Sequence, residues 1–130
     1  FCDAAAPTFC DWAGGLKRQR AGWPVGPAGL TKPEQIAAAA YYDMANLCRY
    51  ITAPTIIRTG FLDTLCASTG HFAVYNRMTC PKLILHNPGA GHSAQLLNPA
   101  EDTKRIQAFQ KEQAALLEKR IAERRAAGAK

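Results

Sequence analysis

Two short β-type runs separated by a helix-length segment are the feature that most constrains the fold of this sequence. Thr55–Thr59 is rich in β-branched residues and lies between a proline and a glycine, which predicts a buried strand. Lys82–His86 has the same character, and Ala67–Met78 between the two runs has the length of a helix. A strand, a crossover helix and a second strand form a βαβ unit, whose strands are parallel. The sequence therefore predicts an α/β fold.

Each predicted strand is followed by a glycine-containing loop that carries one ionisable residue. Asp63 follows the first strand, and His92 follows the second after Gly89-Ala90-Gly91. Because parallel strands end at the same edge of a sheet, where ligands bind in open α/β sheets, we expect the two side chains to lie together. A carboxylate beside an imidazole orients it for work as a general base. We therefore predict that Asp63 and His92 are the catalytic residues.

A set of short motifs lies within roughly the first 98 residues. The motifs are Phe9–Trp12, Tyr41–Leu47, Ile51–Pro54, Gly60–Asp63, Phe72–Asn76, Pro81-Lys82 and Gly91-His92. Together they resemble the carboxy-terminal part of α/β-hydrolase esterases, and are most similar to the acetyl xylan esterase / cephalosporin C deacetylase family. The sequence departs from that family at Cys66–Ser68, where the family usually has prolines just after the acid loop.

The resemblance implies a serine carboxylesterase or deacetylase that acts on small acetylated sugars or related esters. It makes Asp63 the acid and His92 the base of a catalytic triad, and it implies no cofactor. It also implies an oligomer, because the family tends to form them.

The nucleophile of such a triad is missing from this sequence. In α/β hydrolases the serine stands on a Gly-x-Ser-x-Gly elbow and precedes both the acid and the histidine. The two serines, Ser68 and Ser93, both follow Asp63, and neither stands between such glycines. At 130 residues the chain is also short for a complete hydrolase sheet, which commonly needs roughly 250 residues or more.

We therefore expect residues 1–130 to be the carboxy-terminal part of one α/β-hydrolase domain, with the nucleophile supplied by a missing amino-terminal segment or a companion chain. The oxyanion hole would come from the same missing part. The isolated chain is predicted to be inactive. One alternative is a noncatalytic hydrolase-like module that serves assembly.

The segments outside the βαβ unit also have patterns that predict structure. Glycines and prolines predict a surface loop over residues 14–32, and Pro33 with Glu34 predicts the start of a helix. A long carboxy-terminal helix is predicted over residues 99–127, with an apolar stripe at helical spacing. The expected sheet has two full parallel strands and a remnant of a third near the amino terminus.

The histidines and cysteines offer rival chemistry. A metal site formed by His86, His92 and Asp63 is disfavoured because no third nitrogen or sulfur ligand has suitable spacing, so no metal is expected. His71 is interpreted as a surface or packing residue, and His86 as a hydrogen-bond donor in the core.

The five cysteines include no C-x-x-C pair, which disfavours a structural zinc site and favours an interpretation of the cysteines as small buried hydrophobic residues. A disulfide between Cys66 and Cys80 or to another segment, and the cellular compartment, stay open.

The net charge of +6 is concentrated in two basic clusters, at residues 17–20 and 119–130. A basic module that binds polyanions is thus a second alternative, but nucleic-acid binding would need basic residues interleaved with aromatic ones. Only Trp23 lies near either cluster, so solvated helix faces are favoured and no nucleic-acid partner is expected. No apolar run approaches the ~20 residues of a membrane span, so no membrane partner is expected either.

Overall fold

The computed structural model describes residues 1–12, 14 and 32–128. Two units, Phe1–Leu97 and Asn98–Lys130, are each compact and are described separately. The surface loop expected over residues 14–32 lies outside the described residues except for Gly14 and Lys32. None of the helices in the described part of the chain has both the length and the apolar character that crossing a membrane requires.

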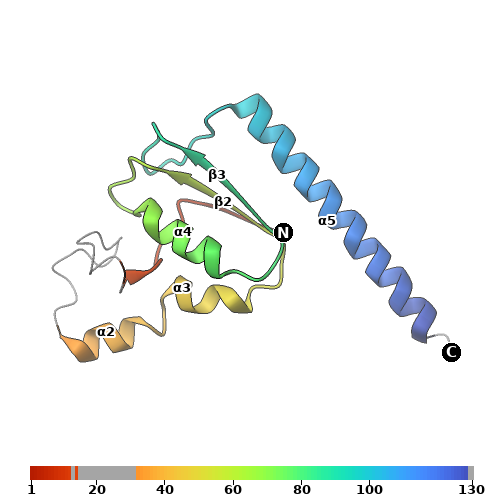
Figure 1. The fold of residues 1–130 in the computed structure, drawn as a ribbon, viewed down its shortest axis with the longest axis horizontal. Helices are drawn as coiled ribbons and strands as arrows, with labels where there is room; N and C mark the ends of the chain where they lie inside the picture. Colours follow the sequence, from red (N-terminus) through yellow and green to blue (C-terminus); the bar gives the residue numbers. More distant parts are fainter. Residues whose placement is uncertain (13, 15–31, 129–130) are drawn as a thin grey trace. The chain divides into compact units, whose positions relative to one another are not determined.

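The first unit is built on a three-stranded parallel sheet in the order β1-β2-β3 (Figure 1). Its strands are β1 (Cys2–Ala5), β2 (Thr55–Gly60) and β3 (Lys82–Asn87). Thr55 at the start of β2 pairs with Cys2 on one side and Lys82 on the other. The three strands thus point the same way and end at one edge, and the predicted α/β fold with its parallel strands is confirmed.

Helices connect and cover these strands. The crossover from β2 to β3 is α4 (Ser68–Arg77), which lies against β2 and also contacts the short helix α3 (Met44–Leu47) (Figure 1). A single 3-10 turn, Cys48–Tyr50, follows α3 and leads to β2, and the helix α2 (Pro33–Ala39) precedes α3 in the chain. Ser68 does not cap α4, because the helix begins at Ser68 itself and Ala67 occupies the capping position without a side-chain hydrogen bond.

The core of this unit forms between β2, α4 and α3. Its buried members are small or medium apolar side chains, namely Ala45, Cys48, Ile57, Val74, Met78 and Cys80. β2 is buried along almost its whole length, as expected for a central strand of a parallel sheet, whose two faces are both covered. This packing fixes the crossover helix on the sheet and thereby the positions of the loops at both ends of that helix.

The second unit contains α5 (Pro99–Gly128), the long helix expected at the carboxy terminus. The Asp102 carboxylate accepts a hydrogen bond from the Asn98 backbone N–H at 3.1 Å, and Glu101 also lies in the first turn. Acidic groups there interact favourably with the helix dipole and with the unpaired N–H groups of the helix start. The apolar stripe ends in half-exposed side chains, Leu116, Leu117 and Ile121.

A buried carboxylate ties the first unit together away from the sheet edge. Asp43 caps α3 by accepting from the backbone N–H of Ala45 at 2.8 Å. The same carboxylate accepts from the N–H groups of Asp11 at 2.7 Å and Trp12 at 2.8 Å. It therefore attaches the segment after β1 to the helical layer, over more than thirty residues of sequence.

Replacing this carboxylate is expected to destabilise the protein. Asp43→Ala should lower the free energy of unfolding by at least about 2 kcal/mol, because it removes a helix cap and leaves buried N–H groups unpaired. Urea denaturation measures the loss. Asp3→Ala is the control, because Asp3 forms an exposed ion pair with Arg58 at 3.0 Å, which is worth about 1 kcal/mol or less. Equal losses in the two variants would contradict this role of Asp43.

Candidate active site

The loops that follow β2 and β3 meet at the carboxyl edge of the sheet. Gly60 pairs with Asn87 at the ends of the two strands, and the Phe61 backbone N–H donates to the Asn87 carbonyl oxygen at 3.1 Å. The Leu62 N–H then donates to the Ala90 carbonyl oxygen at 2.9 Å. A side chain at Gly60 would collide with the carbonyl oxygens of Ala90 and Gly91. Glycine at this position therefore permits the close approach of the two loops.

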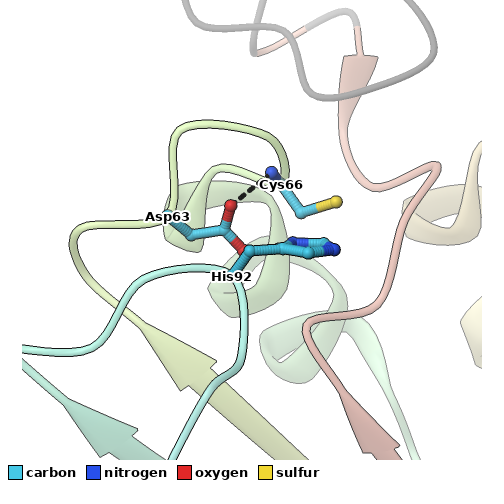
Figure 2. A group of neighbouring side chains, drawn as sticks. All are labelled: Asp63, Cys66 and His92. Atoms are coloured by element: carbon cyan, nitrogen blue, oxygen red, sulfur yellow. Dashed lines mark hydrogen bonds and ion pairs between the residues drawn. The ribbon is translucent and has the colours of Figure 1, made fainter.

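This approach brings the two predicted catalytic residues together (Figure 2). His92 Nδ1 lies 3.0 Å from Asp63 Oδ2. The Asp63 side chain is fully buried, whereas about half of the His92 side chain is exposed. The structure thus places the pair as the topology argument expected, and the catalytic role of the two residues stays a prediction.

Backbone donors fix the carboxylate of Asp63. Its Oδ1 accepts hydrogen bonds from the N–H groups of Leu65 and Cys66, both at 2.8 Å. Oδ2 is therefore left facing His92, and a carboxylate there favours the imidazole tautomer with hydrogen on Nδ1. Nε2 then carries a lone pair. Such an imidazole can accept a proton from a hydroxyl group that approaches Nε2.

A cavity of about 360 Å³ lies beside this pair and is lined by Thr8, Leu65, Cys66 and His92. Thr8 follows β1, so loops after all three strands border the site. Thr8, Leu65 and Cys66 were missed by the sequence analysis. The sequence did contain a signal for Cys66, because this residue stands only three positions after Asp63 in a short loop. It contained no such signal for Thr8, because β1 was expected only as a remnant of a strand.

Cys66 adds a third functional group to the pair. Among the described residues, Asp63, Cys66 and His92 offer one metal-ligand atom each, and these atoms lie within 4.8 Å of one another (Figure 2). His86, the ligand considered from the sequence, is not a member of this group. The structure therefore supplies a third ligand type that the spacing argument did not find.

All five cysteines are free thiols in the structure, so Cys66 and Cys80, whose pairing the sequence left open, form no disulfide here. Cys48, Cys66 and Cys80 are buried, as expected of small hydrophobic residues, while Cys10 is partly buried and Cys2 is exposed. Burial raises the pKa of the Cys66 thiol, and it raises that of Cys10 to about 12, with a smaller contribution from Asp43. Neither thiol is therefore a nucleophile at neutral pH.

His86 lies on the exposed side of β3, where its ring stacks on Phe61 at a centroid distance of 5.6 Å. The prediction that His86 donates a hydrogen bond in the core is therefore wrong. Side chains alternate between the two faces of a strand, so the burial of Leu85 turns His86 to the other face.

His71 is a fully buried packing residue and not a surface one. Its Nε2 lies 2.9 Å from the Pro7 carbonyl oxygen, and its Nδ1 lies 2.6 Å from Thr59 Oγ1. A carbonyl only accepts, so Nε2 carries the hydrogen and Nδ1 accepts from the Thr59 hydroxyl. Burial lowers the pKa of His71 and favours this neutral form. The imidazole thus connects α4, the end of β2 and the loop after β1.

His71 should make the protein sensitive to acid. Its pKa in the folded protein is below its value of about 6.5 in the unfolded chain. The unfolded chain therefore binds the proton first, so stability contributed by neutral His71 is complete above about pH 6.5 and is lost as the pH falls towards the folded-state pKa.

The measurement is the urea midpoint of the wild type and two variants between about pH 7 and pH 5. His71→Gln should show a smaller acid-induced decrease than the wild type, whereas His86→Gln, an exposed control, should match the wild type. A His71→Gln variant with an unchanged pH dependence would refute the assignment.

Comparisons with known proteins identify the family and the fold of this chain. The sequence model of the acetyl xylan esterase family matches residues 27–112. The acetyl esterase Axe7A of Xylanibacter ruminicola is 36% identical over 89 residues, which are 67% of this chain and 20% of that protein. The chain thus spans about a fifth of the curated relative.

Two solved structures share the fold. Acetyl xylan esterase 1 from Thermoanaerobacterium sp. JW/SL YS485 superposes with a TM-score of 0.51 and 24% identity, over 65% of this chain and 26% of that one. The acetyl xylan esterase from Paenibacillus sp. R4 gives a TM-score of 0.61 and 19% identity, over 82% and 35% of the respective chains. The carboxy-terminal α/β-hydrolase fold expected from the sequence is confirmed, and the family match shows that this chain belongs to the acetyl xylan esterase family.

Proposed function

We propose that this chain carries the acid and the base of a serine esterase that removes acetyl groups from small acetylated sugars or related esters. The observation that supports this most is the 3.0 Å contact between His92 Nδ1 and Asp63 Oδ2 at the carboxyl edge of the sheet. Membership of the acetyl xylan esterase family and the similarity to an acetyl esterase support the substrate class.

In this proposal the nucleophilic serine comes from another segment of the protein or from a companion chain. His92 Nε2 takes the proton of that serine as its oxygen attacks the ester carbonyl, and then gives the proton to the departing alcohol. Water, activated by the same nitrogen, hydrolyses the acyl-enzyme and releases acetate. Asp63 keeps the hydrogen on Nδ1 and stabilises the imidazolium that forms in each step.

Neither serine of this chain is suited to the nucleophile's role. Ser68 is the first residue of α4 and follows the acid loop, and Ser93 directly follows the histidine that it would have to approach. A nucleophile elbow needs a strand followed at once by a helix. The isolated chain therefore has a base and no nucleophile, and we propose that it is inactive.

The partner proposed for this chain is the segment that carries the nucleophile. Within the described residues, β1 pairs with β2 on one side only, and Cys2 at its start is exposed. An open strand edge pairs readily with another strand, so β1 is the natural place for the remaining sheet to continue. Association of identical subunits is part of the same proposal.

Asp63→Asn tests the role of the acid. The asparagine oxygen can still accept from the Leu65 and Cys66 N–H groups, but its NH₂ group would face His92 Nδ1 and force the hydrogen onto Nε2. The base is then in the wrong tautomer, and kcat/KM for an acetyl ester should fall roughly 10⁴-fold with little change in stability.

Glu101→Gln, the corresponding change at an exposed carboxylate in the first turn of α5, should leave the activity of the complete protein unchanged. The assay is hydrolysis of an acetyl ester by the complete protein. Wild-type turnover by Asp63→Asn would eliminate Asp63 as the acid.

A fluorophosphonate probe, which reacts with activated serines, tests where the nucleophile is. Intact-mass analysis should show no label on the isolated 130-residue chain and one label on the segment or chain that accompanies it. His92→Ala should abolish that label because the serine loses its base, whereas His86→Ala should not. Label on Ser68 or Ser93 would refute the divided triad, and no label on the complete protein would favour the assembly module.

A further inference from the structure

We propose that Asp63, Cys66 and His92 form a binding site for Zn²⁺, and that the metal ion and proton transfer compete for the same imidazole. The starting observation is that a carboxylate oxygen, a thiol sulfur and an imidazole nitrogen lie within 4.8 Å of one another (Figure 2). The binding itself depends only on these three side chains, whereas its effect on catalysis rests on the proposed esterase function.

The set of ligands fits zinc better than other common ions. Cysteine sulfur, histidine nitrogen and carboxylate oxygen are the usual zinc ligands, whereas Mg²⁺ and Ca²⁺ bind oxygen ligands. Zinc–ligand bonds of about 2.0–2.3 Å place tetrahedral ligand atoms roughly 3.3–3.7 Å apart. Atoms that already lie within 4.8 Å reach that spacing with shifts of about 1 Å or less.

Two of the three ligands are already fixed in place. Asp63 and Cys66 are buried on one tight loop, and the Cys66 backbone N–H donates to Asp63 Oδ1 at 2.8 Å. With the Leu65 N–H donating to the same oxygen, Oδ2 stays directed towards the centre of the group. Hydrogen bonds of this kind to the outer atom of a ligand orient it and strengthen metal binding.

The third ligand is the one that can move. The His92 side chain is half exposed, so its ring can turn from the Asp63 hydrogen bond to a metal ion without disturbing the core. The cavity of about 360 Å³ is lined by both Cys66 and His92, which gives an ion a route to the site. Three protein ligands leave a fourth position for water or for a group of another segment.

Binding releases one proton and removes the base. Zn²⁺ forms its bond to sulfur as the Cys66 thiol loses its proton to solvent, and it takes the lone pair of a His92 nitrogen. A metal-bound imidazole cannot accept the proton of a serine hydroxyl. Zn²⁺ at this site should therefore inhibit acetyl ester hydrolysis.

Cobalt substitution tests the site without any measurement of activity. Co²⁺ bound to the complete protein should give a near-ultraviolet absorption from charge transfer between sulfur and cobalt, and Zn²⁺ should displace it in a titration that yields Kd. Cys66→Ser should abolish the band and weaken Zn²⁺ binding by more than about 100-fold, beyond the effect of losing an outer hydrogen-bond partner. Cys80→Ser, the same change at another buried thiol, should retain both.

His92→Gln gives a second test that does not depend on the buried loop. Because His92 is half exposed, the variant should fold and melt like the wild type, yet bind Zn²⁺ more than about tenfold more weakly. A wild-type protein without the cobalt band, or wild-type affinity in either variant, would overturn the site.

The catalytic consequence is tested separately, in the complete protein. Acetyl ester hydrolysis should disappear at Zn²⁺ concentrations that saturate the site, and return when a chelator removes the metal. Full turnover at saturation would overturn the competition, even if the metal binds. A protein with no turnover at all would refute the proposed esterase function, and the cobalt band would still decide the metal site.

Discussion

The contact between the Leu62 N–H and the Ala90 carbonyl oxygen, at 2.9 Å, is the interaction on which the site depends. It joins two loops that follow neighbouring parallel strands, and it forms only because Gly60 has no side chain to separate them. Parallel strands alone bring the loops to one edge of the sheet. The backbone contact brings them within reach of a 3.0 Å hydrogen bond between Asp63 and His92. A larger residue at Gly60 would therefore damage the site before it damaged the sheet.

The two carboxylate oxygens of Asp63 have separate tasks. Oδ1 pairs with two backbone N–H groups and so determines the shape of the loop, while Oδ2 orients His92. Asp43 has a purely structural arrangement of the same kind, since both of its carboxylate oxygens accept hydrogen bonds from backbone N–H groups. A buried aspartate on a loop is thus no evidence of catalysis by itself. The distinguishing feature of Asp63 is the oxygen that faces a half-exposed imidazole.

The strands, the crossover helix and the meeting of Asp63 with His92 could be predicted because each depends on local pattern and on the direction of parallel strands. The burial of His71 could not, because its partners Pro7 and Thr59 come from two other segments. His86 was misjudged since a strand at the edge of the described sheet need not bury both faces. Cys66 was read as packing, and its position beside His92 appears only when the loop is folded.

Cys66 places a thiol beside the proposed acid, Asp63, and the proposed base, His92. An imidazole that is oriented by a carboxylate and open to a cavity has one lone pair, and a proton and a metal ion compete for it. In a site with only oxygen ligands nearby, zinc would bind weakly and the proton would prevail. A thiol within 4.8 Å of both partners shifts that balance towards the metal. In the proposed site, the loop that directs Asp63 towards His92 therefore also supplies the thiol with which zinc would take the imidazole.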